Sequence, residues 1–389
     1  MHHASFTRFA ARTISQDRHV ARRACSIASA LLCVSALLGC GSDGSGDTSG
    51  GSGCVEGREP GSGLLAAVNS EFCESVAGAL PGEVACAYDF QTCGVPLKAP
   101  EKELSRSSEV DEFAGSGAPN VGCYAPDGYP AKVEPDPSNL ATVTGQVKLF
   151  SHGCMSHDVT IEFWTVNRSG GAADGTPDEL VGTAVTTPED CEADGVEIDK
   201  DDTCGTSTGK YFYCRYSYPD VPTDTELMVK TSGPLYTPIY EYNVFVPSSG
   251  VENGMFEKDI RCVTTDDYPL IAKTAIGGPI TPGHGALAGE VHDCDDIRLV
   301  DAVVDVDVDK KLLTYFTNDQ DHPLPFTDGT STSTLGLYAA IDVVPGPLSV
   351  GAVGLVGGET VTVGFFKAQV FPDAVTSVTF RGLRPFQVP

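Results

Sequence analysis

The sequence predicts an all-β fold in which two tandem β-sandwiches follow a small Cys-rich, partly helical N-terminal region. Its 389 residues include 43 glycines and 26 prolines, a composition typical of short strands joined by turns. Valine-rich runs of alternating polarity recur at the spacing of a sandwich. One set of motifs occurs twice in the same order, which indicates an internal repeat of about a hundred residues.

The strand-like runs divide into two series. The first series covers 141–150, 159–166, 211–218, 226–231 and 239–246, and the second covers 288–291, 302–308, 337–343, 348–353, 361–366 and 375–380. We therefore expect β-sandwich module 1 at 136–262, a linker at 263–286 and β-sandwich module 2 at 287–389.

The two series share motifs at matching positions. Thr144-Gly145-Gln146-Val147 corresponds to Ala288-Gly289-Glu290-Val291, and a valine follows each glycine by fourteen residues, Val159 in one case and Val303 in the other. Segment 206–211 also echoes segment 332–338. We interpret the two series as copies of one module.

Four motifs in the second module are similar to a known sandwich family. They are Gly289-Glu290-Val291, 301–306, 334–338 and Val344-Pro345-Gly346. Together they resemble the carboxypeptidase regulatory-like, or transthyretin-like, β-sandwich, in which a threonine-glycine-tyrosine strand leads to a proline-glycine turn. The resemblance covers 137–389 and is looser in the first module, which has cysteine insertions. It implies rigid spacers or binding appendages that carry no peptidase site.

The first 39 residues have the layout of an export signal. Five arginines precede an apolar run at 24–39, which is too short to span a bilayer core of about 30 Å. The run ends in Leu37-Leu38-Gly39-Cys40, which resembles the lipobox of bacterial lipoproteins. This resemblance implies that Cys40 is acylated and becomes the new N-terminus, and Gly41 after it resembles the outer-membrane class. The alternative is an ordinary signal peptide that is cleaved elsewhere and carries no lipid.

Two segments connect this signal to the modules. Residues 40–53 consist largely of glycine, serine and aspartate, the composition of a flexible tether. Apolar residues at helical spacing between Leu64 and Val76 predict a helix that ends at Leu80-Pro81-Gly82. With its cysteines and a proline-rich stretch at 126–137, segment 54–135 is expected to be a Cys-rich helical cap followed by a stiff linker.

The chain is strongly acidic. Its formal net charge is −28, and removal of residues 1–39, with five arginines and one aspartate, leaves 20 basic and 52 acidic residues, or −32. Such a surface repels phosphate backbones, and no basic stripe with aromatic residues occurs, so we expect no nucleic-acid partner. The acidic side chains serve mainly solubility, and cationic partners fit such a surface better.

The cysteines predict disulfides. Eleven cysteines remain after the signal and the lipid account for three, and disulfides persist in an exported protein. Cys262 is the nearest available partner of Cys294 at the module junction, so we predict a bond between them that fixes the two modules. Cys191 and Cys204 are the second predicted pair. Since eleven is odd, the unpaired thiol is expected in the N-terminal group of cysteines.

One acidic loop is a candidate calcium site. Asp190, Glu192, Asp194 and Asp201 occupy loop positions one, three, five and twelve, with Gly195 at position six, as in a calcium-binding loop. The flanking helices of such loops are not predicted here. The alternative is a solvated loop clipped by a disulfide.

A repeated His-x-Cys pattern raises zinc or copper as a second possibility. It occurs at His152-Gly153-Cys154 and again at His292-Asp293-Cys294. A structural zinc site needs four ligands, and disulfide formation would consume the thiols. We therefore favour bridged cysteines beside exposed histidines.

No residue pattern identifies a reaction or a substrate. We predict a non-enzymatic lipoprotein of the cell envelope, held to the outer membrane by its lipid, whose modules bind a protein or glycan partner or act as spacers. One alternative is a calcium- or carbohydrate-binding surface protein, and another is an enzyme with an unrecognised site. Apart from calcium, no cofactor is expected.

Overall fold

The structure is a computed structural model that describes residues 97–109, 113–124, 127–136, 138–150, 156–169, 174–193, 212–318 and 323–388. In this part the chain is predominantly β, as predicted, and every one of the predicted runs contains a strand. The predicted signal peptide, Cys40, the predicted tether and the predicted helix between Leu64 and Val76 lie outside the described residues. No helix in the described ranges is long and apolar enough to cross a membrane.

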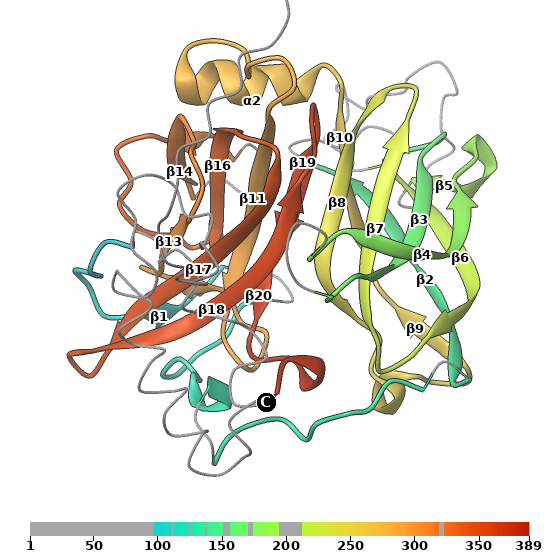
Figure 1. The fold of residues 1–389 in the computed structure, drawn as a ribbon, viewed down its shortest axis with the longest axis horizontal. Coiled ribbons are helices and arrows are strands. Elements are labelled where there is room, and N and C mark those ends of the chain that lie inside the picture. Colours follow the sequence, from blue (N-terminus) through green and yellow to red (C-terminus); the bar gives the residue numbers. More distant parts are fainter. Residues whose placement is uncertain are drawn as a thin grey trace, which may run out of the picture. The chain divides into compact units, whose positions relative to one another are not determined.

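The first module is a pair of packed sheets (Figure 1). One sheet has the order β4 (Pro177–Val185), β3 (Thr160–Val166), β7 (Glu226–Gly233) and β8 (Tyr236–Phe245). The other contains β5 (Cys191–Ala193), β6 (Phe212–Pro222) and β2 (Leu140–Leu149), and β9 (Met255–Glu257) and β10 (Ile260–Thr264) run parallel to β2. Alternate residues of β2, such as Val143 and Val147, are buried in the core, as the period of two requires.

The second module repeats this plan. One sheet consists of β13 (Val303–Val306), β17 (Gly346–Val356) and β18 (Glu359–Val370). The other contains β15 (Pro325–Phe326), β14 (Leu312–Phe316), β16 (Leu337–Val343), β11 (Gly285–His292), β19 (Val375–Val378) and β20 (Phe380–Arg381). Its core includes Leu287, Val350 and Phe366, all fully buried.

The internal repeat extends to single contacts. Gly145 on β2 pairs with Tyr216, and Gly289 on β11 pairs with Tyr338. Each tyrosine hydroxyl donates a 2.6 Å hydrogen bond to a carbonyl near the end of its module, that of Lys258 between β9 and β10 or that of Val378 at the end of β19. A Cβ atom on Gly145 would lie 2.1 Å from the Lys258 oxygen, and one on Gly289 would lie 1.8 Å from the Val378 oxygen. Both positions therefore require glycine.

These contacts correct one part of the sequence alignment. The counterpart of Tyr338 is Tyr216, so segment 332–338 does not correspond to segment 206–211. The two segments have similar sequences because both are polar and precede a strand, and this similarity led to the wrong alignment. Segment 206–211 itself lies outside the described residues.

The segment expected to be a linker, 263–286, is largely structured. β10 extends to Thr264, helix α2 spans Asp267–Ile276, and β11 already begins at Gly285. The Thr264 hydroxyl accepts a hydrogen bond from the Asp267 amide at the start of the helix, and Gly277 ends it with a φ of 73°. The helix buries Ala272 and Ala275 against the second module, and this burial stabilises a segment whose short apolar pattern did not predict a helix.

The two modules are joined edge to edge. β8 pairs in parallel with β19 from Ile239 with Val375 to Tyr242 with Val378, so one sheet continues from the first module into the second. The rings of Tyr240 and Phe371 stack across this junction with their centroids 3.7 Å apart. In addition, Arg168 of the first module forms an ion pair with Glu226 and donates to the Lys367 carbonyl of the second.

The described part of the N-terminal region docks on the second module. β1 (Ser105–Arg106) pairs with β12 (Leu299–Val300), and Arg106 forms a 2.7 Å ion pair with buried Asp293. Cys123 forms a disulfide with Cys294. Short 3-10 turns occupy Gly122–Tyr124 (η1), Pro188–Asp190 (η3), Ser248–Gly250 (η4) and Pro385–Gln387 (η5).

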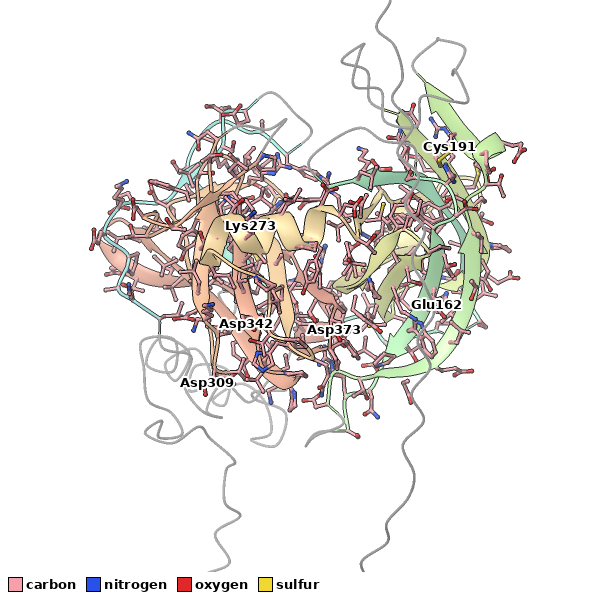
Figure 2. All side chains as sticks on the ribbon, turned by 90° about the horizontal axis from the view of Figure 1, so that it is seen from above. Glu162, Cys191, Lys273, Asp309, Asp342 and Asp373 are labelled. Carbon is pink, nitrogen blue, oxygen red and sulfur yellow. A yellow bond between two sulfur atoms is a disulfide. The ribbon has the colours of Figure 1, made fainter. Side chains whose placement is uncertain are left out.

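The predicted disulfides are wrong. Cys294 bonds to Cys123, which is 171 residues away, and Cys262 is a free thiol buried in the first core. Cys191 bonds to Cys214, its direct neighbour across β5 and β6, and not to Cys204 (Figure 2). Proximity along the sequence was the wrong guide, because strand pairing and the docked N-terminal segment decide which sulfurs meet. The unpaired thiol is therefore not confined to the N-terminal group.

Candidate functional site

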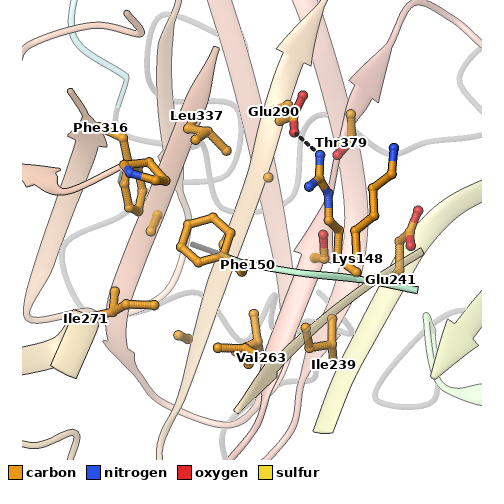
Figure 3. A pocket seen from close by; sticks show the side chains of 18 of the residues that line it. Lys148, Phe150, Ile239, Glu241, Val263, Ile271, Glu290, Phe316, Leu337 and Thr379 are labelled. Atoms are coloured by element: carbon orange, nitrogen blue, oxygen red, sulfur yellow. Dashed lines mark ion pairs between the residues drawn. The ribbon is translucent and has the colours of Figure 1, made fainter. Parts of the chain in front are cut away.

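A cavity of about 610 Å³ lies where the two modules meet. It is lined by outward-facing residues of the sheet that runs from β16 through β11, β19, β8 and β10 to β2, and by helix α2. Figure 3 shows that one end is apolar, with Phe150, Ile271 and Val263, and that the other carries Lys148, Glu241 and Glu290. We call this cavity the junction cleft.

The floor of the junction cleft is hollow because its central side chains are small. Two rows of paired residues cross it, and they are Ile341, Ala286, Val375 and Ile239 in the first row and Ala339, Ala288, Ser377 and Glu241 in the second. Four of these eight side chains are alanine or serine. Larger side chains there would fill the space, so the cleft follows directly from this composition.

The apolar end is built from aromatic and branched side chains. The rings of Phe150 and Phe316 meet edge to face with centroids 6.0 Å apart, although one follows β2 and the other ends β14. Ile271 of α2 and Leu337 of β16 line the same end. An apolar ligand group bound at this end would be removed from water and would pack against apolar side chains beside α2, which is favourable.

Two cations lie side by side at the polar end. Lys148 of β2 and Arg261 of β10 are directly paired across the two parallel strands, and both line the cleft. The Lys148 ammonium lies 2.6 Å from an Asp259 oxygen. The neighbouring Lys258 is likewise paired with Glu241 at 2.6 Å.

Arg261 is the less well paired of the two cations. Its side chain is 49% exposed, and its closest carboxylate oxygen among the described residues is that of Glu290, 3.9 Å away. The other Glu290 oxygen lies 2.9 Å both from the His292 ring and from the Arg298 guanidinium. A distance of 3.9 Å exceeds that of a hydrogen bond, so the Arg261 guanidinium is available to a ligand.

A buried ion cluster closes this end behind Glu290. His292 is fully buried, with one ring nitrogen 2.9 Å from Glu290 and the other 2.8 Å from Asp296. Arg298 and Arg381 lie over the Phe113 ring at 5.1 and 5.0 Å from its centroid. The prediction of an exposed histidine beside a bridged cysteine is therefore half wrong, because Cys294 is bridged but His292 is buried.

The carboxylates of the cluster stay ionised. Burial alone would raise the pKa of Glu290, but its hydrogen bond with His292 and the charges of Arg298 and Arg261 lower that pKa well below its usual range. Burial likewise opposes ionisation of Asp296, yet the hydrogen bond with His292 and the charge of Arg381 lower its pKa to about 2. Neither carboxylate is a general acid near neutral pH.

The ion cluster and the cation pair occupy equivalent positions in the repeat. His292 and Arg381 pair across β11 and β20 as Lys148 and Arg261 pair across β2 and β10. Two residues before each first member stands Glu290 in the second module but Gln146 in the first. The first module therefore has an uncharged amide where the second has the carboxylate that contacts His292 and Arg298.

Of the site residues predicted from the sequence, none of those that the structure describes lines the junction cleft. The Asp190 carboxylate accepts hydrogen bonds from the Thr187 amide and hydroxyl at 2.7 and 2.8 Å, so it caps its own turn. Asp194, Asp201 and the Glu192 side chain lie outside the described residues, as does Cys40. In the part of the chain that the structure describes, no group of three or more His, Cys, Asp or Glu side chains is placed to hold a metal ion.

One feature of the sequence could have pointed to the residues of the cleft. Strand alternation places Gln146 and Lys148 on the outer face of β2, while basic residues are scarce in this acidic chain. The pairing of Lys148 with Arg261, 113 residues later, depends on which strands become neighbours. The sequence alone did not reveal it.

Comparison with known proteins assigns no family to the chain. No family model matches the sequence, and no curated protein matches it. Among solved structures, the Bacillus anthracis TIE protein is similar over 61% of this chain and 33% of its own, with 10% identity and a TM-score of 0.17. This chain thus spans about a third of the length of that structure, and no argument is built on the similarity.

Proposed function

We propose that the protein is a non-enzymatic, lipid-anchored component of the cell envelope that binds a ligand in the junction cleft. The apolar run before Leu37-Leu38-Gly39-Cys40 and the flexible composition of 40–53 support the anchor, with the outer membrane as its site. A tethered, disulfide-bonded β protein is suited to the oxidising conditions outside the cytoplasm.

The observation that carries the binding role is the cleft at a fixed module junction. Its volume of about 610 Å³ falls within the range of about 300 to 1,000 Å³ for small-molecule sites. The strand pairing of β8 with β19 and the hydrogen bond from Arg168 to the Lys367 carbonyl hold its two walls in place. Such preorganisation favours ligand binding over a purely spacing role.

We also infer that both modules are transthyretin-like sandwiches. The repeated strand order and the shared glycine-tyrosine contact support a common ancestry of the two modules. The Pro345-Gly346 turn of the second module has Gly346 at a φ of 133°, a conformation that favours glycine.

The anchor is tested by intact-mass analysis of membrane-extracted protein, comparing wild type with Cys40→Ala. A diacyl or triacyl mass increment that is lost in the variant is expected. A soluble, unacylated wild-type product would contradict the anchor and leave a secreted protein.

The binding role is tested by native mass spectrometry of protein purified from its producing cells. We expect a retained small molecule in the wild type and its loss in Ala288→Phe, which fills the floor of the cleft. Val185→Phe on the exposed face of β4 is the control, because it introduces the same aromatic ring at a position that does not line the cleft. Equal retention in wild type and Ala288→Phe would contradict the proposal.

A further inference from the structure

We infer that the ligand of the junction cleft is an amphipathic anion, with its acidic group between Lys148 and Arg261 and its apolar body over the alanine floor. This inference rests on the proposed binding function. It names the ligand class, which neither the acidic composition nor the module resemblance indicates.

The first argument is charge. Two cations directly opposite each other on neighbouring strands repel each other. Asp259 offsets Lys148 at 2.6 Å, but Arg261 has no carboxylate oxygen within hydrogen-bond distance among the described residues. An oxyanion bound to Arg261 would remove this imbalance and gain charge-assisted hydrogen bonds.

The second argument is the comparison within the repeat. At the equivalent place in the second module, Glu290 and Asp296 supply two carboxylates to His292 and Arg381. In the first module, Gln146 stands in place of Glu290. Both members of the second-module pair therefore have a carboxylate partner, whereas in the first module Lys148 has Asp259 and Arg261 has no carboxylate oxygen within hydrogen-bond distance among the described residues.

The acidic residues of the cleft do not favour a cationic ligand. Glu241 is bound by Lys258, Asp259 by Lys148, and Glu290 by Arg298. Each of these carboxylates therefore already has a protein cation as its partner, and a cationic ligand would have to displace one.

The third argument is the position of the apolar surface. Val263 follows Arg261 by two residues on β10 and lines the same cleft, so it lies about 7 Å from it along the strand. Ile239 and Val375 continue the apolar surface on the next strands. A ligand whose acidic group contacts Arg261 thus has its apolar body next to it, as in a carboxylate with an aliphatic or aromatic chain.

The test is calorimetric titration of the full chain carrying Cys40→Ala, so that no anchoring lipid competes. The probes are decanoate, decylamine and acetate. We expect one equivalent of decanoate to bind, with decylamine and acetate at least about tenfold weaker, because one lacks the anion and the other the apolar body.

Variants on this background separate the two parts of the site. Arg261→Gln and Lys148→Gln should each weaken decanoate binding about tenfold, the range for one charged hydrogen bond. Lys273→Gln removes the same charge from an exposed position of α2 and should leave the affinity unchanged (Figure 2). Ala288→Phe should abolish binding.

The outcomes distinguish this inference from the proposed function. If decylamine binds as well as decanoate, or if both Arg261→Gln and Lys148→Gln bind decanoate like the wild type, the anion inference is overturned while the cleft remains a binding site. If Ala288→Phe binds decanoate normally, the cleft is not the site and the proposed function fails as well.

Discussion

The two modules share a scaffold and differ on the outer face of their first strand. Gly145 with Tyr216 and Gly289 with Tyr338 make the same contact, with the carbonyl of Lys258 in one module and of Val378 in the other. Outside, β2 presents threonine, glutamine and lysine, whereas β11 presents Ala286, Ala288 and Glu290. The buried contacts are therefore the same in both modules and specify their fold. The outer faces of the same strands differ, and together they line the cleft.

The second difference is what each module does with the side-chain pair at this position, Lys148 with Arg261 or His292 with Arg381. In the second module the pair belongs to a buried cluster that also contacts Phe113 of the N-terminal segment. In the first module the pair faces the cleft. One module thus uses the position to dock a segment of its own chain, and the other is proposed to use it for a ligand.

The largest expected effect concerns the disulfides, which also differ between the modules. Cys123–Cys294 closes a loop of 171 residues, and Cys191–Cys214 closes one of 23. Loop-closure entropy predicts losses of about 5 and about 3 kcal/mol in the free energy of unfolding when each bond is removed by a double serine substitution. Urea denaturation measures both, and a larger loss for the shorter loop would contradict the account.

The next effect tests the shared glycines. Gly289→Ala and Gly145→Ala would each force a Cβ against a backbone carbonyl, so each should lower the free energy of unfolding by about 3 kcal/mol. Gly278→Ala is the control, because nothing lies within 4 Å of its added Cβ. Unchanged urea midpoints for the two tight glycines would show that the equivalent contacts are not part of the scaffold.

The ion cluster should make the second module sensitive to acid. Glu290 and Asp296 have lower pKa values in the folded state than in the unfolded chain, so their stabilisation is complete above about pH 4, the unfolded value. It is lost as the pH falls toward the folded values, about 2 for Asp296. Melting temperatures from pH 6 to pH 2 should therefore fall less steeply in Glu290→Gln than in wild type. A parallel fall in both would contradict the role of Glu290.

The smallest effect concerns the free thiol of the first module. Burial raises the pKa of Cys262 to about 12, so the native thiol should not react with a disulfide reagent at pH 8. Reaction is expected only after unfolding in urea. Rapid labelling of Cys262 in the native protein, located by peptide mapping, would show that its core is open.

The sequence predicted those parts of the fold that depend on local periodicity. Alternation identified β2 and β3 because each has one face in a core. It missed β4, an edge strand whose exposed Leu180 and Val185 break the pattern, and β10, which is short and crosses the predicted boundary between the first module and the linker. Helix α2 was missed because its stability comes from packing on the second module.

Local sequence patterns could not predict the contacts between segments that are far apart in the sequence. The disulfide between Cys123 and Cys294 depends on which elements pack together, and so does the pairing of Lys148 with Arg261. The alanines of the cleft floor could not be recognised from the sequence, because small residues also occur in strands that line no cleft. The candidate calcium loop was visible in the sequence, but most of it lies outside the described residues.

The calcium loop therefore stays a prediction. Calcium that binds the native protein should raise its melting temperature, and Asp201→Asn together with Asp194→Asn should remove that effect. An identical melting temperature with and without calcium would rule out the site.

The most direct test of the account transfers one feature between the modules. Gln146→Glu gives the first module the carboxylate that the second has at Glu290. Titration of decanoate into this variant on the Cys40→Ala background should show binding at least about tenfold weaker than without it, because the new carboxylate would lie beside Lys148, as Glu290 lies beside His292, and would repel the bound anion. Wild-type affinity in Gln146→Glu, with the carboxylate ionised, would contradict the claim that the cleft binds an anion at this cation pair.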